Sequence, residues 1–449
     1  MSLNRLSHFG GQVHNVFGIQ VGVGITIAIR SRNERRIRYY RVPEFWRKEE
    51  KLAFLRKHEL KWQHLSPDLS HTWLISKHGE EFATFLSIAE VFEVYSYGMN
   101  TARDAVVYDY NQQALSTRIQ SFVDDYNNEV DRYRRSNKPK NVSAFINYER
   151  VKWSESLRLS LMRGVHATYD PAKIRRSFYR PFTCKWLYFD RILNHRVFQF
   201  PLLFPNASSV NELLWIKTGS EWSMFPLAVN AICDALPQGG SQCFPFYTYK
   251  PDGTEQTENI TDAALQQFRS HYKDPSITKW DIFHYIYGIL HHPGYREKFA
   301  ENLRRELPRI PFAPDFHVFA EAGRQLAELH IGYEALKPWP LDFLENPAVP
   351  FSWRVERMRL NKNKTALTVN ESLTLDNIPP EAFHYRLGNR SALEWVIDQY
   401  RITEDARSGI RSDPNREDDP EYIVRLVGQV VRLSLETVRI VNSLPEQYT

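Results

Sequence analysis

The sequence predicts an α+β protein in which mixed β structure is supported by helices. Residues 201–260 contain short apolar segments separated by proline-rich turns, which is the pattern of short strands. Within them, Asp252-Gly253 is typical of a hairpin turn. Residues 280–334 instead carry apolar side chains at intervals of three and four, which indicates helices with one buried face. Strands in one stretch and helices in another indicate the α+β class.

Length and composition exclude several classes of protein. A chain of 449 residues is long enough for two or three domains, and 42% hydrophobic with 25% charged residues excludes wholesale disorder. Three cysteines without a CxxC spacing argue against disulfides and structural zinc, and favour a reducing compartment. The N-terminus lacks a signal-peptide pattern, and the apolar run 13–29 is too short and too polar to cross a membrane. We therefore expect a soluble, cytoplasmic protein with no membrane partner. The net charge of +5 permits a nucleic-acid partner without requiring one.

The N-terminal stretch predicts a hairpin. β-Branched residues dominate 13–29, which indicates a buried strand, and residues 37–42 predict the strand that pairs with it. The connecting turn, Arg30 to Arg38, is basic, and it is either a solvated loop or a DNA-facing one. The glycines of the first strand do not fit the G-x-G-x-x-G fingerprint of dinucleotide-binding proteins.

The next stretch is expected to be mainly helical. Residues 61–110 predict mixed helix, a polar turn around Gly98 and a short strand. Residues 114–135 predict a helix whose buried stripe contains Ile119, Phe122 and Tyr126. The basic segment RYRRSNKPKN that follows marks a boundary, read most simply as a solvated linker.

The densest signal for nucleic acid lies in residues 173–196, where basic and aromatic side chains interleave. Arginines supply phosphate contacts and readout of guanine, while Asn194 and Gln199 have the amides that pair with adenine. The other interpretation is that the aromatics are core and the arginines its rim. Part of it must hold, because Trp186, Tyr188 and Asp190 alternate on one face of a predicted strand. The candidate DNA contacts are Arg175, Arg176, Arg180, Lys185, Trp186, Arg191, Asn194 and Arg196.

Three helices are expected in residues 280–334. The first ends at Pro293-Gly294, and the second is stopped by Pro308 and Pro311. The third follows Asp315. The expected buried stripes are Ile282, Tyr285, Ile286, Ile289 and Leu290; then Tyr295, Phe299 and Leu303; then Phe316, Phe319, Gly323, Leu326 and His330.

The C-terminal stretch predicts strands and then helices. Residues 350–380 indicate a basic strand pair with an exposed turn at 361–364. Ser391 and Glu394 have the spacing of a capping box, which begins a helix. The last helix is expected to follow Asp419 and to bury Ile423, Leu426, Val430, Thr437 and Val441.

Four histidines, His284, His291, His292 and His330, raise the question of a metal. Zinc sites need three or four converging ligands, and no HExxH motif or cysteine partner accompanies them. We therefore expect no metal here, and expect capping and core hydrogen bonds from these side chains instead.

Several motifs of the chain resemble those of a known family. FHYIYGILHHPGYREKFAENLRRELPRIPF is similar to the signature of the C-terminal specificity domain of type ISP restriction–modification enzymes, and so are YRPF followed by WLYFD, and SGIRSDPN. Those bacterial enzymes join nuclease, helicase-like ATPase, adenine methyltransferase and target-recognition parts in one chain. HNVFGIQVGVGITIAIR is similar to a segment late in their methyltransferase domain.

The resemblance implies a domain plan and a function. Residues 1–60 would be the end of a methyltransferase domain, 61–140 a helical connector, 141–380 the target-recognition domain and 381–449 a C-terminal helical region. The chain would bind double-stranded DNA and direct adenine-N6 methylation and restriction of an asymmetric site, together with a methyltransferase and helicase-nuclease part. S-adenosylmethionine, ATP and Mg²⁺ would serve that full enzyme, with no cofactor bound by this chain. The alternative is a stand-alone DNA-binding remnant or interaction protein without an enzymatic partner.

The catalytic signature of the family does not occur in this sequence. Amino-methyltransferases use a D/N-P-P-Y/F loop to bind the target amine and stack on the flipped base, and no such tetrapeptide is found. A glycine-rich cofactor loop and a G-x-x-x-x-G-K-[ST] phosphate loop do not occur either. We therefore assign no catalytic residue to this chain and expect it to be inactive alone.

Overall fold

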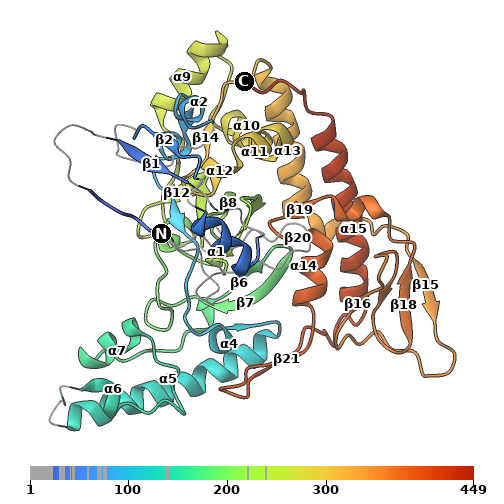
Figure 1. Cartoon of the computed structure of the whole chain (residues 1–449). Helices are drawn as coiled ribbons and strands as arrows, with labels where there is room; N and C mark the ends of the chain where they lie inside the picture. Colours follow the sequence, from blue (N-terminus) through green and yellow to red (C-terminus); the bar gives the residue numbers. More distant parts are fainter. Residues whose placement is uncertain are drawn as a thin grey trace.

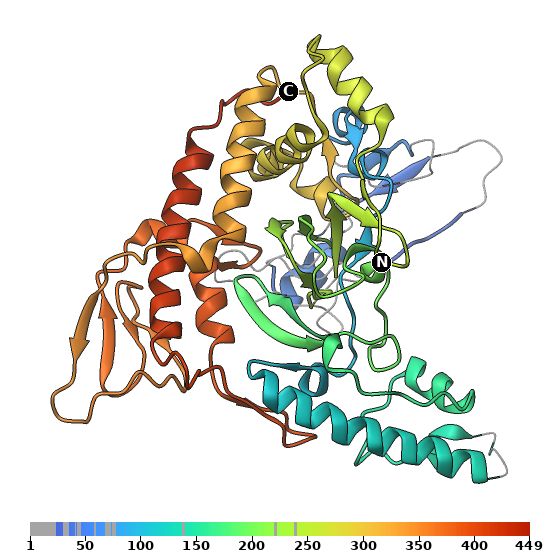
Figure 2. The same cartoon turned by 180° about the vertical axis from the view of Figure 1, so that it is seen from behind.

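The computed structural model describes residues 24–29, 36–40, 42, 46–57, 60–67, 73, 78–136, 139, 141–219, 222–237 and 240–449. It confirms the α+β class, with helices and several separate sheets (Figure 1). A helical arm extends at one end of the molecule, a group of short sheets occupies the middle, and long helices flank it on one side (Figure 2). None of the helices in these residues is long and apolar enough to cross a membrane.

The first central sheet is built on a hairpin. Its strands run in the order β10 (Ile232–Cys233), β6 (Ile174–Arg180), β7 (Thr183–Tyr188) and β5 (Tyr108–Asp109), and all pairs but β10–β6 are antiparallel. The strand predicted at Trp186 and Tyr188 is therefore confirmed. Phe182 in the hairpin turn has a φ of +52°, a left-handed conformation that disfavours a side chain. Its ring is fully buried and lies 5.3 Å from that of Tyr333, so packing offsets the strain.

The second central sheet is buried on both faces. Its antiparallel strands are β4 (Ser96–Tyr97), β11 (Ser241–Pro245), β8 (Leu213–Lys217) and β9 (Pro226–Val229). Leu213 and Trp215 face one hydrophobic core, whereas Leu214 and Ile216 face the other, as the two-residue period of a strand requires. Beyond it, β12 (Tyr247–Tyr249) and β13 (Gln256–Glu258) form the hairpin predicted at Asp252-Gly253.

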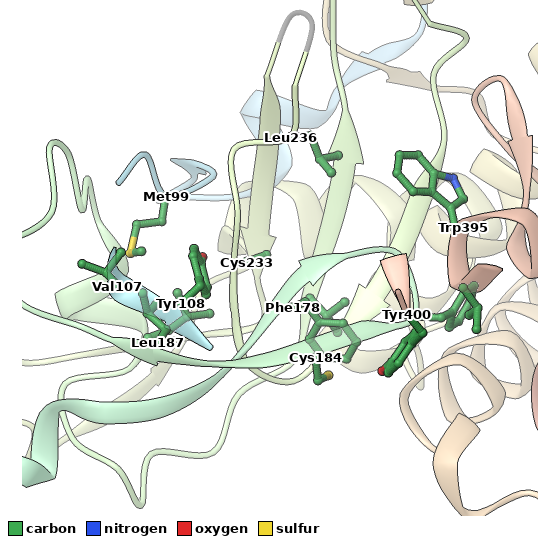
Figure 3. Close-up of a cluster of buried hydrophobic side chains, with 14 of the residues drawn as sticks. Met99, Val107, Tyr108, Phe178, Cys184, Leu187, Cys233, Leu236, Trp395 and Tyr400 are labelled. Carbon is green, nitrogen blue, oxygen red and sulfur yellow. The ribbon is translucent and has the colours of Figure 1, made fainter. Parts of the chain in front are cut away.

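Figure 3 shows how distant segments meet in the first of these cores. Phe178 and Cys184 of the β6–β7 hairpin lie near Tyr400, which follows a C-terminal helix. The thiols of Cys233 and Cys243 are 3.4 Å apart on neighbouring elements. All three cysteines are buried and free, and burial raises the pKa of the Cys184 and Cys233 thiols.

The second core contains the helices predicted from residues 280–334. They are α10 (Lys279–His291), α11 (Pro293–Lys298), α12 (Ala300–Leu303) and α13 (Phe316–Ile331), and the preceding helix α9 (Asp262–Tyr272), which was not predicted, packs in the same core. The first and third predicted helices are confirmed, and Asp315 accepts a hydrogen bond from the backbone of Val318 at the start of α13. The α10–α13 crossing is close, because a Cβ added at Gly323 would overlap the carbonyl oxygen of His284.

The prediction of one continuous second helix is wrong. The backbone leaves helical geometry at Phe299, which separates α11 from α12. Phe299 is fully buried with its ring 5.2 Å from that of Phe82 and 5.3 Å from that of Phe85. The break allows Phe299 to join this distant aromatic cluster, while Tyr295 and Leu303 stay buried as predicted.

The helical arm contains α5 (Gln112–Arg135), α6 (Val142–Phe145) and α7 (Glu155–Met162). The stripe Ile119, Phe122 and Tyr126 is buried, as predicted. Asn111 begins α5 by accepting a hydrogen bond from the backbone of Ala114.

At the other end, a sheet runs in the order β15 (Asp342–Glu345), β18 (Leu373–Asp376), β17 (Leu367–Thr368) and β16 (Arg359–Leu360). It contains the predicted basic strand pair with its exposed 361–364 turn. Ser391 and Glu394 form the predicted capping box of α14 (Ala392–Gln399). The last helix, α15 (Tyr422–Asn442), buries its predicted stripe except for the half-buried Val441.

The shorter elements connect these parts. They are β1 (Ile37–Tyr39), α1 (Lys48–Arg56), β2 (Gln63–Leu65), α2 (Gly79–Ala83), β3 (Leu86–Ser87), α3 (Ile88–Val91), α4 (Asp104–Val107), α8 (Phe200–Leu203), β14 (Arg309–Ile310), β19 (Arg386–Leu387), β20 (Arg390–Ser391), β21 (Thr403–Glu404) and β22 (Arg411–Ser412). Short 3₁₀ turns lie at η1 (Pro171–Lys173), η2 (Tyr333–Ala335) and η3 (Pro380–Phe383).

The N-terminal prediction is only partly correct. β1 exists, and its described partner is β2, which the sequence did not predict. Of that predicted strand, 13–23 lies outside the described residues, and 24–29 is neither strand nor buried. Ile25, Ile27 and Ile29 are all exposed. The prediction of a buried strand fails for these six residues, because no described element pairs with them or covers them.

Candidate nucleic-acid interface

The eight residues predicted to contact DNA do not form one surface. Arg191 and Arg196 are exposed, and neither side chain makes a hydrogen bond or ion pair with the residues that the structure describes. The other six are engaged within the protein to different degrees. The two exposed arginines flank one tight turn that follows β7, so they are the predicted residues best placed to meet a ligand.

A buried carboxylate fixes the start of this turn. Asp190 accepts hydrogen bonds from the backbone N–H groups of Ile192, at 2.7 Å, and Leu193, at 2.9 Å. The ammonium of Lys173 donates to the second carboxylate oxygen at 2.6 Å. The Asp190 carboxylate therefore fixes the backbone of the turn that carries Arg191, and Lys173 holds that carboxylate in place.

Asn194 supports the same turn from within. Its amide nitrogen donates to the carbonyl oxygens of Tyr188, at 2.8 Å, and Asp190, at 2.9 Å. Because the side chain is fully buried, the structure contradicts the prediction that Asn194 reads an adenine. Both amide hydrogens serve to hold the turn, which is how a buried amide avoids the cost of unpaired donors.

A buried arginine outside the predicted set completes the support. Arg103 donates to the carbonyl oxygen of Leu193, to that of Lys152 at 3.0 Å, and to the hydroxyl of Ser154 at 2.7 Å. Burial lowers the pKa of Arg103 to about 10, so its guanidinium remains charged at neutral pH. The backbone between Arg191 and Arg196 is thus bonded on its inner side.

Arg180 lies in a buried ion pair and not on a DNA-facing surface. Its guanidinium donates to the Asp234 carboxylate at 2.6 Å and lies 3.9 Å from that of Asp104. Burial raises the pKa of Asp234 to about 6 even though Arg180 opposes the shift. This pair joins β6 to the segment after β10, and the structure contradicts the prediction of a DNA contact at Arg180.

Lys185 is adjacent to that ion pair. Its ammonium lies 4.4 Å from the ring centres of both Tyr110 and Tyr179. Burial, followed by the charge of Arg180, lowers the pKa of Lys185 to about 7. The ammonium of this half-buried lysine is thus engaged by aromatic rings, and its contact with DNA stays a prediction.

The remaining three predicted residues are also engaged. Arg175 donates to the carbonyl oxygens of Phe204, at 2.7 Å, and Pro205, at 3.3 Å. Arg176 is half exposed, but its guanidinium is paired with the Glu334 carboxylate. Trp186 is half-buried and packs against the first hydrophobic core. Arg175, Arg176 and Trp186 therefore stabilise contacts between elements.

An aromatic pocket, not predicted from the sequence, lies next to the turn. It has a volume of about 290 Å³. Its lining residues are Tyr95, Ser96, Tyr97, Phe198, Gln199 and Gln242. The backbones of Asn100 and Arg196 exchange two hydrogen bonds, of 3.0 and 2.8 Å, which joins the segment of the tyrosines to that of the arginines.

The sequence contains only partial signals for this pocket. Tyr95 and Tyr97 were part of the predicted polar turn around Gly98, and Gln199 was considered as a partner for adenine. Gln242 carried no signal, because it lies in an apolar strand far from the tyrosines in sequence. Only strand pairing places Gln242 directly opposite Tyr97.

A second hollow, of about 540 Å³, lies between the start of α5 and the segments around residues 352–354 and 410–420. Three of the four arginines that line it are compensated from within the protein. Arg354 is paired with Asp413 at 2.6 Å, Arg118 is paired with Asp109, and Arg416 lies over the ring of Tyr422. The fourth, Arg411, is exposed without a side-chain partner among the described residues, so this hollow offers one unpaired arginine whereas the turn after β7 presents two.

Three of the four histidines, His291, His292 and His330, make the expected capping or core hydrogen bonds. His292 caps α11 by accepting a hydrogen bond from the backbone of Tyr295, and His330 bridges Tyr287 and Thr437 through its two ring nitrogens. Burial lowers the pKa of His291 to about 3 and that of His284 to about 4. The described residues include no group of three or more His, Cys, Asp or Glu side chains that could hold a metal ion.

Comparison with known proteins identifies the fold. The sequence profile of the type ISP C-terminal specificity domain matches residues 90–426. This chain belongs to the type ISP specificity-domain family. No relative was found among proteins with curated descriptions.

Three solved structures share the fold of this specificity domain. The cryo-EM structure of a DrdV–DNA complex matches with a TM-score of 0.85 and 33% identity, over 97% of this chain and 46% of that one. A nuclease-deletion mutant of the type ISP enzyme LlaGI, in complex with a DNA substrate mimic, matches with a TM-score of 0.84 and 29% identity, over 97% and 42%. LlaBIII, an ATP-dependent type ISP enzyme bound to DNA, matches with a TM-score of 0.83 and 25% identity, over 99% and 30%. The chain thus spans less than half the length of these enzymes.

Proposed function

We propose that this chain recognises a DNA target sequence for a type ISP restriction–modification enzyme. In this role it directs adenine-N6 methylation and restriction to a specific asymmetric site. The observation that supports the proposal most strongly is the braced turn that carries Arg191 and Arg196. These are two exposed guanidinium groups without partners among the described residues, in a fold shared with two type ISP enzymes and with DrdV, all solved with DNA or a DNA mimic.

The chemistry of arginine suits this role. A guanidinium binds phosphate oxygens or the O6 and N7 atoms of guanine through two parallel hydrogen bonds. A backbone that is already fixed lowers the conformational entropy that a base or phosphate contact costs. The hydrogen bonds of Asp190, Asn194 and Arg103 fix the backbone on which both arginines lie.

The proposal extends to the partners of the chain. The chemistry of methylation and restriction would reside in methyltransferase and helicase-nuclease parts of the same enzyme or operon, in the cytoplasm. S-adenosylmethionine, ATP and Mg²⁺ would be bound there, since the sequence has no phosphate loop or D/N-P-P-Y/F loop and its described residues offer no metal-ligand group. The alternating, exposed Ile25, Ile27 and Ile29 support a partner surface near residues 24–29 and favour this role over that of a stand-alone DNA-binding protein.

Target recognition is tested by selection from a pool of duplexes with a random central segment. The purified chain is incubated with the pool, and the retained DNA is sequenced. We expect enrichment of one asymmetric sequence. A retained pool with the composition of the input would reduce the chain to a non-specific DNA-binding protein, and no retention at low salt would overturn the proposal.

The dependence on a partner is tested by labelled methyl transfer from S-adenosylmethionine to the selected DNA. The chain alone is expected to transfer no label, because it lacks the catalytic loop. Addition of a type ISP methyltransferase part that carries this loop is expected to produce labelling at the selected sequence. Label transfer by the purified chain alone would contradict the proposal.

A further inference from the structure

The pocket beside the turn has an aromatic wall and a polar floor. Tyr97 on β4 and Phe198, which follows the turn, have ring centres 5.3 Å apart. Tyr95 stacks on the buried Phe244 at 5.3 Å, so this ring is supported from the core side. Tyr95, Tyr97 and Phe198 are all exposed, although large aromatic side chains are usually at least partly covered. Three exposed rings around one hollow form a surface on which a flat molecule can stack.

The polar floor is the side chain of Gln242. It is only 6% exposed, and its amide oxygen is buried without a hydrogen-bond partner. Gln242 is opposite Tyr97 in the β11–β4 pair, and paired residues project to the same face of a sheet. Native proteins pair nearly all buried polar groups, so an unpaired amide at the floor of a hollow points to a missing ligand.

The backbone at the pocket is also unusual. Phe198 has a φ of +47°, a left-handed conformation that a bulky residue rarely adopts. Strained residues of this kind concentrate at ligand-binding positions, where the surrounding structure holds them. Here the backbone N–H of Gln199 donates to the hydroxyl of Ser96 at 3.2 Å, which ties the Phe198 segment to β4.

We infer that this pocket binds a single nucleobase drawn out of the stack of the bound DNA. The inference rests on the proposed function, since it requires a DNA-binding chain. The base stacks on Tyr97 and Phe198 while its edge meets the amide of Gln242. An amide offers one acceptor and one donor side by side, which matches adenine or cytosine, bases that carry an exocyclic amino group next to a ring nitrogen.

Three features favour a nucleobase over an apolar protein segment. The floor is an unpaired amide, which an apolar side chain would leave unsatisfied. Arg196 is exposed two residues before Phe198, in position to contact the phosphate that flanks an extruded base. Stacking of bases on aromatic side chains is also the general way in which proteins hold unpaired nucleotides.

The test measures binding of the whole chain to three labelled duplexes of the same sequence. One is perfectly paired, one carries a single bulged adenine, and one carries an abasic bulge at the same position. Unstacking costs least for a base that is already unpaired, so the bulged adenine removes most of the cost of extrusion. The abasic bulge has the same flexibility but no base, and it therefore separates occupation of the pocket from a preference for bent DNA.

We expect the chain to bind the bulged-adenine duplex about tenfold more tightly than either of the other two duplexes. Tyr97→Ala is expected to remove this preference, whereas Tyr97→Phe retains the ring and the preference. Tyr148→Ala is the matched control, since Tyr148 is 57% exposed and Tyr97 58%, and Tyr148 does not line the pocket. Replacement of the bulged adenine by purine, which lacks the amino group, is expected to weaken binding to wild type but not to Gln242→Leu.

The outcomes are distinct. No binding to the paired duplex would overturn the proposed function itself. Binding to the paired duplex with equal affinity for all three probes would overturn the nucleobase pocket and leave the proposed function standing. If the adenine and abasic bulges both strengthened binding equally, the chain would merely prefer flexible DNA. That result would also overturn the inference of a nucleobase pocket. Gln242→Leu removes a buried side chain, so Tyr97→Ala, an exposed substitution, keeps the test independent of folding.

Discussion

The guanidinium of Arg103 donates a hydrogen bond to the carbonyl oxygen of Leu193, in the middle of the turn that carries Arg191 and Arg196. One fully buried arginine thereby fixes the backbone that presents two exposed ones. Taken alone, the charges of the three arginines look alike in the sequence. In the structure, the buried Arg103 stabilises the turn, whereas the exposed Arg191 and Arg196 are available to a ligand.

Substitution Arg103→Met is expected to loosen this turn. It leaves the acceptors at Leu193, Lys152 and Ser154 without their donor, and unsatisfied buried acceptors cost about 1–3 kcal/mol of stability. Hydrogen exchange should accelerate at residues 190–196, and DNA affinity should fall although residue 103 is buried. Arg118→Met is the control, because Arg118 bonds Asp109 and the carbonyl of Ala105 but not this turn. Unchanged protection of residues 190–196 in Arg103→Met would disprove the bracing role.

Arg176→Ala is expected to affect stability and not DNA binding. Arg176 is paired with Glu334, which also accepts hydrogen bonds from the hydroxyls of Tyr422, at 2.9 Å, and Tyr333, at 3.1 Å. Burial opposes ionisation of Glu334, but Arg176 and these hydrogen bonds lower its pKa overall. Loss of Arg176 should lower the free energy of unfolding by roughly 1–3 kcal/mol. Glu334→Gln should have a similar effect in a urea titration, and a change in the salt dependence of DNA binding would contradict this assignment.

The lowered pKa of Lys185 predicts how the stability of the folded chain depends on pH. Its pKa in the folded chain is about 7, below its ordinary value of 10.5, so the unfolded chain binds more protons between these two values. The contribution of Lys185 to stability therefore rises with pH across this window, with a limiting slope of about 1.4 kcal/mol per pH unit. Urea unfolding of wild type and Lys185→Met from neutral to alkaline pH measures this difference. We expect the advantage of Lys185→Met to be largest near pH 7 and to shrink as the pH rises, and a constant difference would refute a buried ammonium.

The helical part of the fold follows from local patterns. The stripes at Ile282–Leu290 and Phe316–His330, and the capping box at Ser391, lie within a few turns of sequence, so periodicity and end signals predict them. The break at Phe299 could not be predicted, because its cause is packing against Phe82 and Phe85, more than a third of the chain away. The partner of β1 was missed for the same reason.

The candidate site depends on contacts between residues that are far apart in the sequence. The stretch 173–196 combined arginines and aromatics in a pattern typical of nucleic-acid binding, and it does contain the exposed Arg191 and Arg196. The pattern could not reveal that Arg180 pairs with Asp234 or Arg176 with Glu334, because those carboxylates lie on other elements. Nor could it reveal the pocket, where strand pairing brings Gln242 opposite Tyr97.

A salt titration of duplex binding measures whether Arg191 and Arg196 contact DNA. Wild type is compared with Arg191→Ala, Arg196→Ala and the control Arg439→Ala, whose exposed guanidinium is paired with Glu436 at 2.7 Å on α15. If each arginine neutralises a phosphate, its removal weakens binding and flattens the log–log slope of affinity against salt by about one. If instead it reads a base, its removal costs roughly 1–3 kcal/mol on the selected sequence alone. We expect one of these two results for both Arg191→Ala and Arg196→Ala and neither for Arg439→Ala. Binding by both variants with wild-type affinity and slope on every sequence would contradict the account.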